Sequence, residues 1–186
     1  VAGVMRVHVL SNAPQLVAVQ LIPSHEGAYF SVSNLLGTAG IPEDTEVKIY
    51  APAQANYVSE RFQGGTWTPN TNPLALGDAI WITCPTNHDF LIAGMAPDRL
   101  TAPTATVTLV EGMQLVGYPY PVDAVGTGAV LGAAAEGDLV LRVDGDGLPN
   151  PGGGALTNPA SGYYGAGDGW KPGSSFKTME AFWYRS

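Results

Sequence analysis

DAIW, at residues 78–81, returns near the other end of the chain as EAFW, at residues 180–183. Each stretch places an acidic residue and an alanine before a large apolar residue and a tryptophan. Upstream of each, at nearly the same spacing, WTP at residues 67–69 is matched by WKP at residues 170–172. All four tryptophans therefore fall at two equivalent positions, and this repetition predicts that one structural unit occurs twice.

Weaker echoes extend the repeat over most of the chain. The clearest of these matches is QLV, which occurs at residues 15–17 and at residues 114–116. Residues 46–49 (EVKI) correspond to residues 138–141 (DLVL). We expect a first repeat over residues 1–94, a linker over residues 95–103 and a second repeat over residues 104–186. Pro97 and Pro103 discourage regular structure in that linker.

Alternating apolar and polar residues indicate strands. Residues 4–10 put Val4, Arg6 and His8 on one face and Met5, Val7 and Val9 on the other. The only helical turns we expect are at residues 31–37 and 129–135. The pattern predicts an all-β protein of two tandem homologous small β-barrel or β-sandwich domains. The other expected strands are residues 15–22, 46–50, 79–83, 90–93, 104–110, 114–118, 138–143, 162–165 and 181–185.

The composition excludes several classes of partner. Only 13% of the 186 residues are charged, the net charge is −8, and no cluster of Lys or Arg exists, so we expect no nucleic-acid partner. No apolar run is long enough for a membrane helix, so we expect no membrane insertion. The sequence opens at Val1 without Met, and we interpret this as removal of a signal peptide. Cys84 is the single cysteine, either a small apolar residue near a strand or the site of an intermolecular disulfide.

The order of these motifs resembles a family of secreted bacterial proteins with two tandem β-rich repeats. The matching stretches are residues 112–116 (GMQLV), 136–140 (EGDLV), 169–172 (GWKP) and 180–183 (EAFW), with residues 77–81 (GDAIW) as the looser counterpart of the last. The resemblance covers almost the whole chain. It implies secretion and a β-rich fold, but no established activity and no catalytic residues. A departure is the unusually Gly-, Pro- and Asn-rich segment 144–164, for which we expect a loop function of its own.

No catalytic constellation is evident in the sequence. His8, His25 and His88 follow no metal-binding or nucleophile spacing. Asp78 and Glu180 occupy equivalent positions, whereas an acid and a base need different environments, so we expect them to accept backbone hydrogen bonds. We therefore expect no enzyme and no cofactor. The one metal hypothesis is a weak calcium site at Asp144 and Asp146, joined by Asp168.

The low charge and the repeated lobes favour self-assembly. We expect an extracellular or cell-surface structural protein, the subunit of a filament, tube or surface layer, whose partners are copies of itself. The terminal strands 4–10 and 181–185 would pair with a neighbour's sheet edge. The alternative is a secreted carbohydrate-binding module for cell-surface polysaccharide, using Tyr163, Tyr164 or an exposed tryptophan. The expected subunit contacts are Val4, Val7, Val9, Tyr163, Tyr164, Phe182 and Tyr184, and the expected structural core residues are Trp67, Trp81, Trp170 and Trp183.

Overall fold

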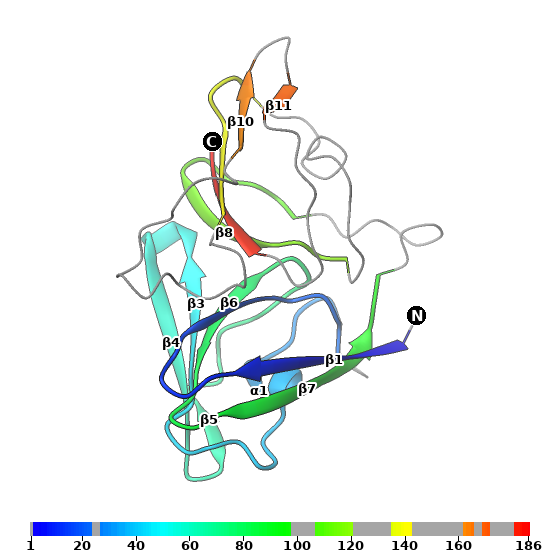
Figure 1. The fold of residues 1–186 in the computed structure, drawn as a ribbon, viewed down its shortest axis with the longest axis vertical. Helices are drawn as coiled ribbons and strands as arrows, with labels where there is room; N and C mark the ends of the chain where they lie inside the picture. Colours follow the sequence, from blue (N-terminus) through cyan, green and yellow to red (C-terminus); the bar gives the residue numbers. More distant parts are fainter. Residues whose placement is uncertain are drawn as a thin grey trace.

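The computed structural model describes residues 2–23, 27–97, 107–120, 135–142, 162–165, 169–171 and 181–186. These residues form twelve strands with one short α-helix and one 3-10 turn, so the all-β prediction is confirmed. The strands make a two-stranded ribbon and two five-stranded sheets. Figure 1 shows the ribbon and the first sheet in its lower half and the second sheet above them.

The ribbon joins β1 (Ala2–Val9) to β7 (His88–Met95) in an antiparallel ladder. Its side chains alternate between the two faces, as expected for strands covered on one side. Val7 and Val9 of β1 and Phe90 and Ile92 of β7 are buried, whereas the residues between them face outward. The ribbon therefore has one core face and one solvent face.

The first sheet runs in the order β2-β6-β3-β4-β5, with antiparallel neighbours. The 3-10 turn η1 (Pro52–Gln54) connects β3 to β4. Val47 and Ile49 of β3 point to the core, and Glu46, Lys48 and Tyr50 point to the other face. The strand bounds are β2 (Gln15–Ala18), β3 (Glu46–Ala51), β4 (Asn56–Gln63), β5 (Thr66–Thr68) and β6 (Ala79–Thr83).

The second sheet has the order β8-β12-β9-β10-β11. Its strand bounds are β8 (Met113–Gly117), β9 (Leu139–Arg142), β10 (Gly162–Gly165), β11 (Gly169–Lys171) and β12 (Ala181–Arg185). β12 lies between β8 and β9 and is paired on both sides. The expectation that this terminal strand would offer an edge to a neighbour is therefore wrong.

Both sheets connect their strands in the same way. In each sheet, the strand that comes last in the chain lies between the first and the second strands. The third strand pairs with the second, and the fourth strand pairs with the third. The register agrees as well. Trp81 lies opposite Leu16 and Lys48, Trp183 opposite Leu115 and Leu141, Trp67 opposite Phe62, and Trp170 opposite Tyr164. This register matches residues 46–49 with residues 139–142, one position later than the sequence comparison predicted.

The main core lies between the ribbon and the inner face of the first sheet. The helix α1 (Val32–Leu36) closes one side of it, and Ser31 caps that helix through a capping box with Asn34. Trp67 of β5 is buried in this core and packs edge-on against Phe62, with ring centroids 5.4 Å apart. These contacts make the first half a small sandwich of ribbon and helix against sheet.

A second cluster joins the two sheets, and we call it the seam. Its buried members are Leu16, Ala18, Ala79, Leu115 and Ala181, and the half-buried rings of Tyr50, Tyr57, Trp81 and Trp183 pack against them. The backbone N–H of Gly117 donates to the carbonyl of Gly77 at 2.8 Å across the seam. The seam therefore holds the outer face of the first sheet against the second.

Several predicted elements need correction. Residues 107–110 form no strand, β2 ends at Ala18 instead of residue 22, and β7 continues to Met95, one residue into the expected linker. The strands β4, β5 and β11 were not predicted, because β4 places the charged Glu60 on its buried face and β5 and β11 are only three residues long. The helical turn predicted at residues 31–37 is confirmed as α1, whereas residues 129–134 and 98–106 lie outside the described residues.

Candidate functional site

The outer face of the ribbon carries a continuous row of exposed apolar side chains. Cross-strand pairs place Ala2 beside Met95, Val4 beside Ala93 and Arg6 beside Leu91, and all of these residues are exposed. The exposed fractions are 72% for Val4, 68% for Leu91 and 50% for Met95. A contiguous exposed apolar surface is a candidate site of interaction.

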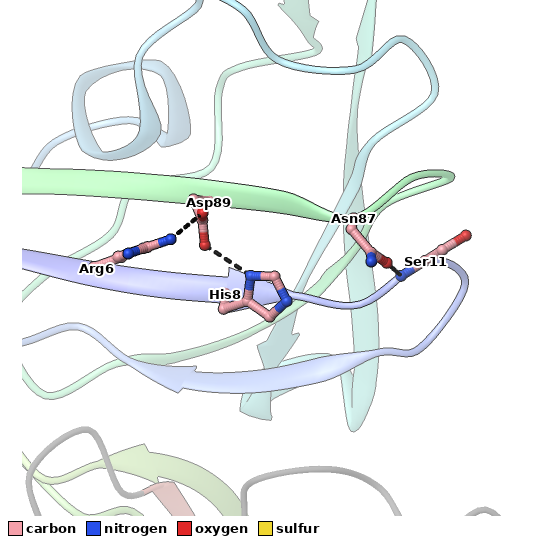
Figure 2. Close-up of polar contacts among 5 residues, drawn as sticks. All are labelled: Arg6, His8, Ser11, Asn87 and Asp89. Carbon is pink, nitrogen blue, oxygen red and sulfur yellow. Dashed lines mark hydrogen bonds and ion pairs between the residues drawn. The ribbon is translucent and has the colours of Figure 1, made fainter.

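The ribbon's other end is polar. Figure 2 shows Arg6 and His8 of β1 converging on Asp89 of β7. Arg6 Nη2 donates to Asp89 Oδ2 at 2.5 Å, and His8 Nδ1 lies 2.7 Å from Asp89 Oδ1. One carboxylate thus bridges two groups on the opposite strand, and the charges of Arg6 and Asp89 compensate one another.

The bridge shifts the ionisation of its members. The hydrogen bond from Arg6, followed by that involving His8, lowers the pKa of Asp89 to about 2. The same contact with Asp89 raises the pKa of Arg6. Because a carboxylate that is paired and hydrogen-bonded favours its ionised form, Asp89 stays charged well below neutral pH.

An acid–base role for the His8–Asp89 pair would need a nucleophile within reach of His8. Ser11 follows β1 three residues after His8, but its Oγ donates to the carbonyl of Pro85 at 2.6 Å. The backbone N–H of Ser11 donates to Asn87 Oδ1 at 2.8 Å. Figure 2 shows Ser11 and Asn87 to one side of the His8–Asp89 pair. Ser11 therefore does not complete a Ser-His-Asp triad with His8 and Asp89 in this structure.

The seam presents a second surface, at which aromatic rings meet. Tyr50 contacts Tyr57 and Trp183 edge-on, with centroid separations of 5.4 and 4.8 Å. Trp81 Nε1 donates to the phenolic oxygen of Tyr57 at 3.1 Å, and partial burial raises the pKa of that phenol. Trp81 and Trp183 are thus half-buried at the contact between sheets, whereas Trp67 is buried in the main core and its Nε1 donates to the carbonyl of Gly37 at 2.8 Å.

Four of the expected contact residues are buried. Val7 and Val9 belong to the main core, and Phe182 and Tyr184 belong to a separate core under the second sheet. Their assignment as subunit contacts is corrected, because strand alternation turns their side chains inward. Tyr184 instead donates from its hydroxyl to Asp138 Oδ2 at 2.5 Å, and burial raises its pKa. Val4 alone of the expected β1 residues is exposed.

Other predicted residues fall partly outside the described structure. The backbone of Tyr163, Tyr164 and Trp170 belongs to β10 and β11, but their side chains lie outside the described part. Five further residues lie wholly outside the described structure: Asp144, Asp146, Asp168, Glu180 and His25. The calcium hypothesis therefore has no structural description. Within the described ranges, no group of three potential metal ligands comes together.

The remaining candidates have structural surroundings. Asp78 Oδ2 accepts from the backbone N–H of Ala75 at 2.7 Å, as expected for a turn before a strand, and burial raises the pKa of Asp78. Cys84 is buried in the main core, where burial raises the pKa of its thiol. The ring of His88 packs edge-on against the ring of Phe90, with the ring centroids 4.7 Å apart.

Sequence reasoning missed the polar bridge and the assembled seam. Asp89 is more than 80 residues from Arg6 and His8 in the chain, and only the pairing of β1 with β7 brings it to them. In the described ranges, no helix has the length and apolar character that a bilayer crossing requires.

Comparison with protein-family models, curated proteins and solved structures finds no match to this chain.

Proposed function

We propose that this protein is a structural subunit of an extracellular assembly and that copies associate through the outer face of the β1–β7 ribbon. The observation that carries the proposal is the row of exposed apolar residues, Val4, Leu91 and Met95, on paired strands. Covering such a row removes apolar surface from water, at about 25 cal/mol per Å². No comparable gain is available to an isolated chain.

The local charge of the ribbon permits contact with a second copy. The chain carries a net charge of −8, so two copies repel one another over most of their surfaces. On the ribbon, Arg6 compensates Asp89, so this repulsion is weaker at this face than elsewhere. Within the described residues, β1 is paired only with β7, and its other edge can accept a strand from a neighbour.

We also propose that the subunit contains two tandem copies of one domain. Support comes from the shared strand order and register of the two sheets. The turns before β3 and β9 also agree: the N–H of Thr45 donates to Pro42 O at 3.2 Å, and the N–H of Asp138 donates to Ala135 O at 3.1 Å. The preceding residues, Asp44 and Gly137, both have positive φ. The resemblance to secreted two-repeat proteins supports an extracellular location.

Sedimentation velocity over a concentration series, with negative-stain microscopy, tests the proposal. We expect concentration-dependent self-association of the wild-type chain and its loss in Leu91→Lys, which places a charge on the ribbon. Val110→Lys is the matched control, because Val110 is 46% exposed but lies before β8, away from the ribbon. Only monomers at every concentration would exclude self-assembly, and equal effects of both substitutions would exclude the ribbon as the contact.

A further inference from the structure

The outer face of the first sheet has a composition unlike that of the ribbon. At its seam end stand the half-buried rings of Tyr50, Tyr57 and Trp81, joined from the second sheet by Trp183. Their edge-on contacts bury the edge of one ring against the face of another. All four rings retain exposed surface although the second sheet already packs there.

Beside the rings, the same face is lined by hydrogen-bonding side chains. The register places Lys48 between Trp81 and Ser59, and Glu46 between Thr83 and Arg61. Lys48, Ser59 and Arg61 are exposed, and Lys48 is 47% exposed at its side chain. Donors and acceptors therefore continue directly from the aromatic surface along three neighbouring strands.

The charges of this face are balanced. Glu46 lies 3.5 Å from Lys48 Nζ and 3.7 Å from Arg61 Nη2, and Asp44 lies 3.9 Å from Arg61 Nη1. Since each cation already has a carboxylate partner, an anionic ligand gains little here, and a cationic one gains little as well. The face suits a neutral ligand with many hydroxyl groups.

The size of the face sets the size of the ligand. Three strands spaced about 4.8 Å apart and alternate residues about 6.8 Å apart along each strand give a patch of roughly 10 by 14 Å. A stable protein partner covers about 800 Å², several times that area. Two or three sugar rings fit, because their apolar C–H faces can pack on the aromatic rings while their hydroxyl groups reach the polar row.

We propose that the outer face of the first sheet, from Trp81 and Tyr57 to Lys48 and Arg61, binds a neutral oligosaccharide. The Tyr57 hydroxyl accepts from Trp81, which leaves its own proton available as a donor. The polar row orients the sugar, and the seam rings supply the apolar contact. This binding is independent of assembly, because the ribbon covers the opposite face of the first sheet.

Tryptophan fluorescence, with cellohexaose, laminarihexaose and chitohexaose as separate probes, tests the proposal on the full chain. We expect at least one probe to give a saturable change with a Kd at or below about 1 mM, and the Lys48→Ala/Arg61→Ala double variant to weaken it about tenfold or more. Both residues are exposed, so the variant is expected to remain folded, and its thermal unfolding midpoint checks this.

Leu91→Lys is the control variant, because it changes the ribbon and leaves this face intact. We expect it to bind the probe as the wild type does, even where it abolishes assembly, so the two proposals can fail separately. Absence of saturable binding by all three probes up to about 10 mM would overturn the saccharide proposal. Unchanged affinity in the folded double variant would do the same.

Discussion

Ala18 and Gly117 lie against each other across the seam, at matching register positions of two sheets with the same strand order. Ala18 is paired with Ala79 and Gly117 with Ala181. A Cβ placed on Gly117 would stand 2.9 Å from the Cβ of Ala18 and 2.3 Å from the carbonyl oxygen of Asp78. The second sheet can approach the first this closely only because residue 117 has no side chain.

Gly117→Ala is therefore expected to destabilise the protein by about 1–3 kcal/mol, the usual cost of overpacking. The backbone atoms that it meets cannot move aside without breaking the hydrogen bond from Gly117 to Gly77. Urea unfolding measures the change. Gly27→Ala is the matched control, since nothing lies within 4 Å of its added Cβ, and a similar loss in both variants would contradict the close-packed seam.

The Arg6–Asp89 pair predicts an acid-dependent part of the stability. Because the pKa of Asp89 is lowered to about 2, its contribution is complete above the unfolded value of about 3.9 and disappears as the pH falls toward 2. The wild type should thus exceed Asp89→Asn in stability at pH 7, and this difference should shrink between about pH 4 and pH 2. Urea unfolding at several pH values measures it, and a difference independent of pH would refute the assignment.

Trp67→Phe should destabilise the protein more than Trp81→Phe. Trp67 is buried, and its loss leaves the carbonyl of Gly37 without its donor, which costs about 1–3 kcal/mol. Trp81 is half-buried, so water can replace its donor at Tyr57. Thermal and urea unfolding of both variants measure the two losses of stability. A larger loss in Trp81→Phe than in Trp67→Phe would contradict the prediction.

Asn72→Ala should weaken the fold through Glu60, whose side chain is fully buried on β4. The backbone N–H and the Nδ2 of Asn72 both donate to Glu60 Oε1 at 2.9 Å. Removing the side-chain donor should cost about 1–3 kcal/mol. A double-mutant cycle with Glu60→Leu should show a coupling of about 0.5–3 kcal/mol, and additive effects would mean that this bond contributes nothing to stability.

Local patterns were sufficient to predict most strands. Alternation defined β1 and β3 to within two residues at each end, because covering one face of a strand imposes a period of two residues. The helix α1 was predicted as a helical turn between polar and glycine residues. The strands β4, β5 and β11 were missed, because β4 buries the charged Glu60 and the other two strands are only three residues long.

The sequence by itself determined the all-β character, the division of β1 into two faces and the matched positions of the tryptophans. Only the tertiary structure decided that β12 is a central strand, that Arg6 and His8 meet Asp89, and that Trp183 packs on Tyr50. The physical reason is that alternation records which side of a strand is buried, whereas strand order depends on hydrogen bonds between residues far apart in the chain. Those long-range pairings created both surfaces that we propose for binding.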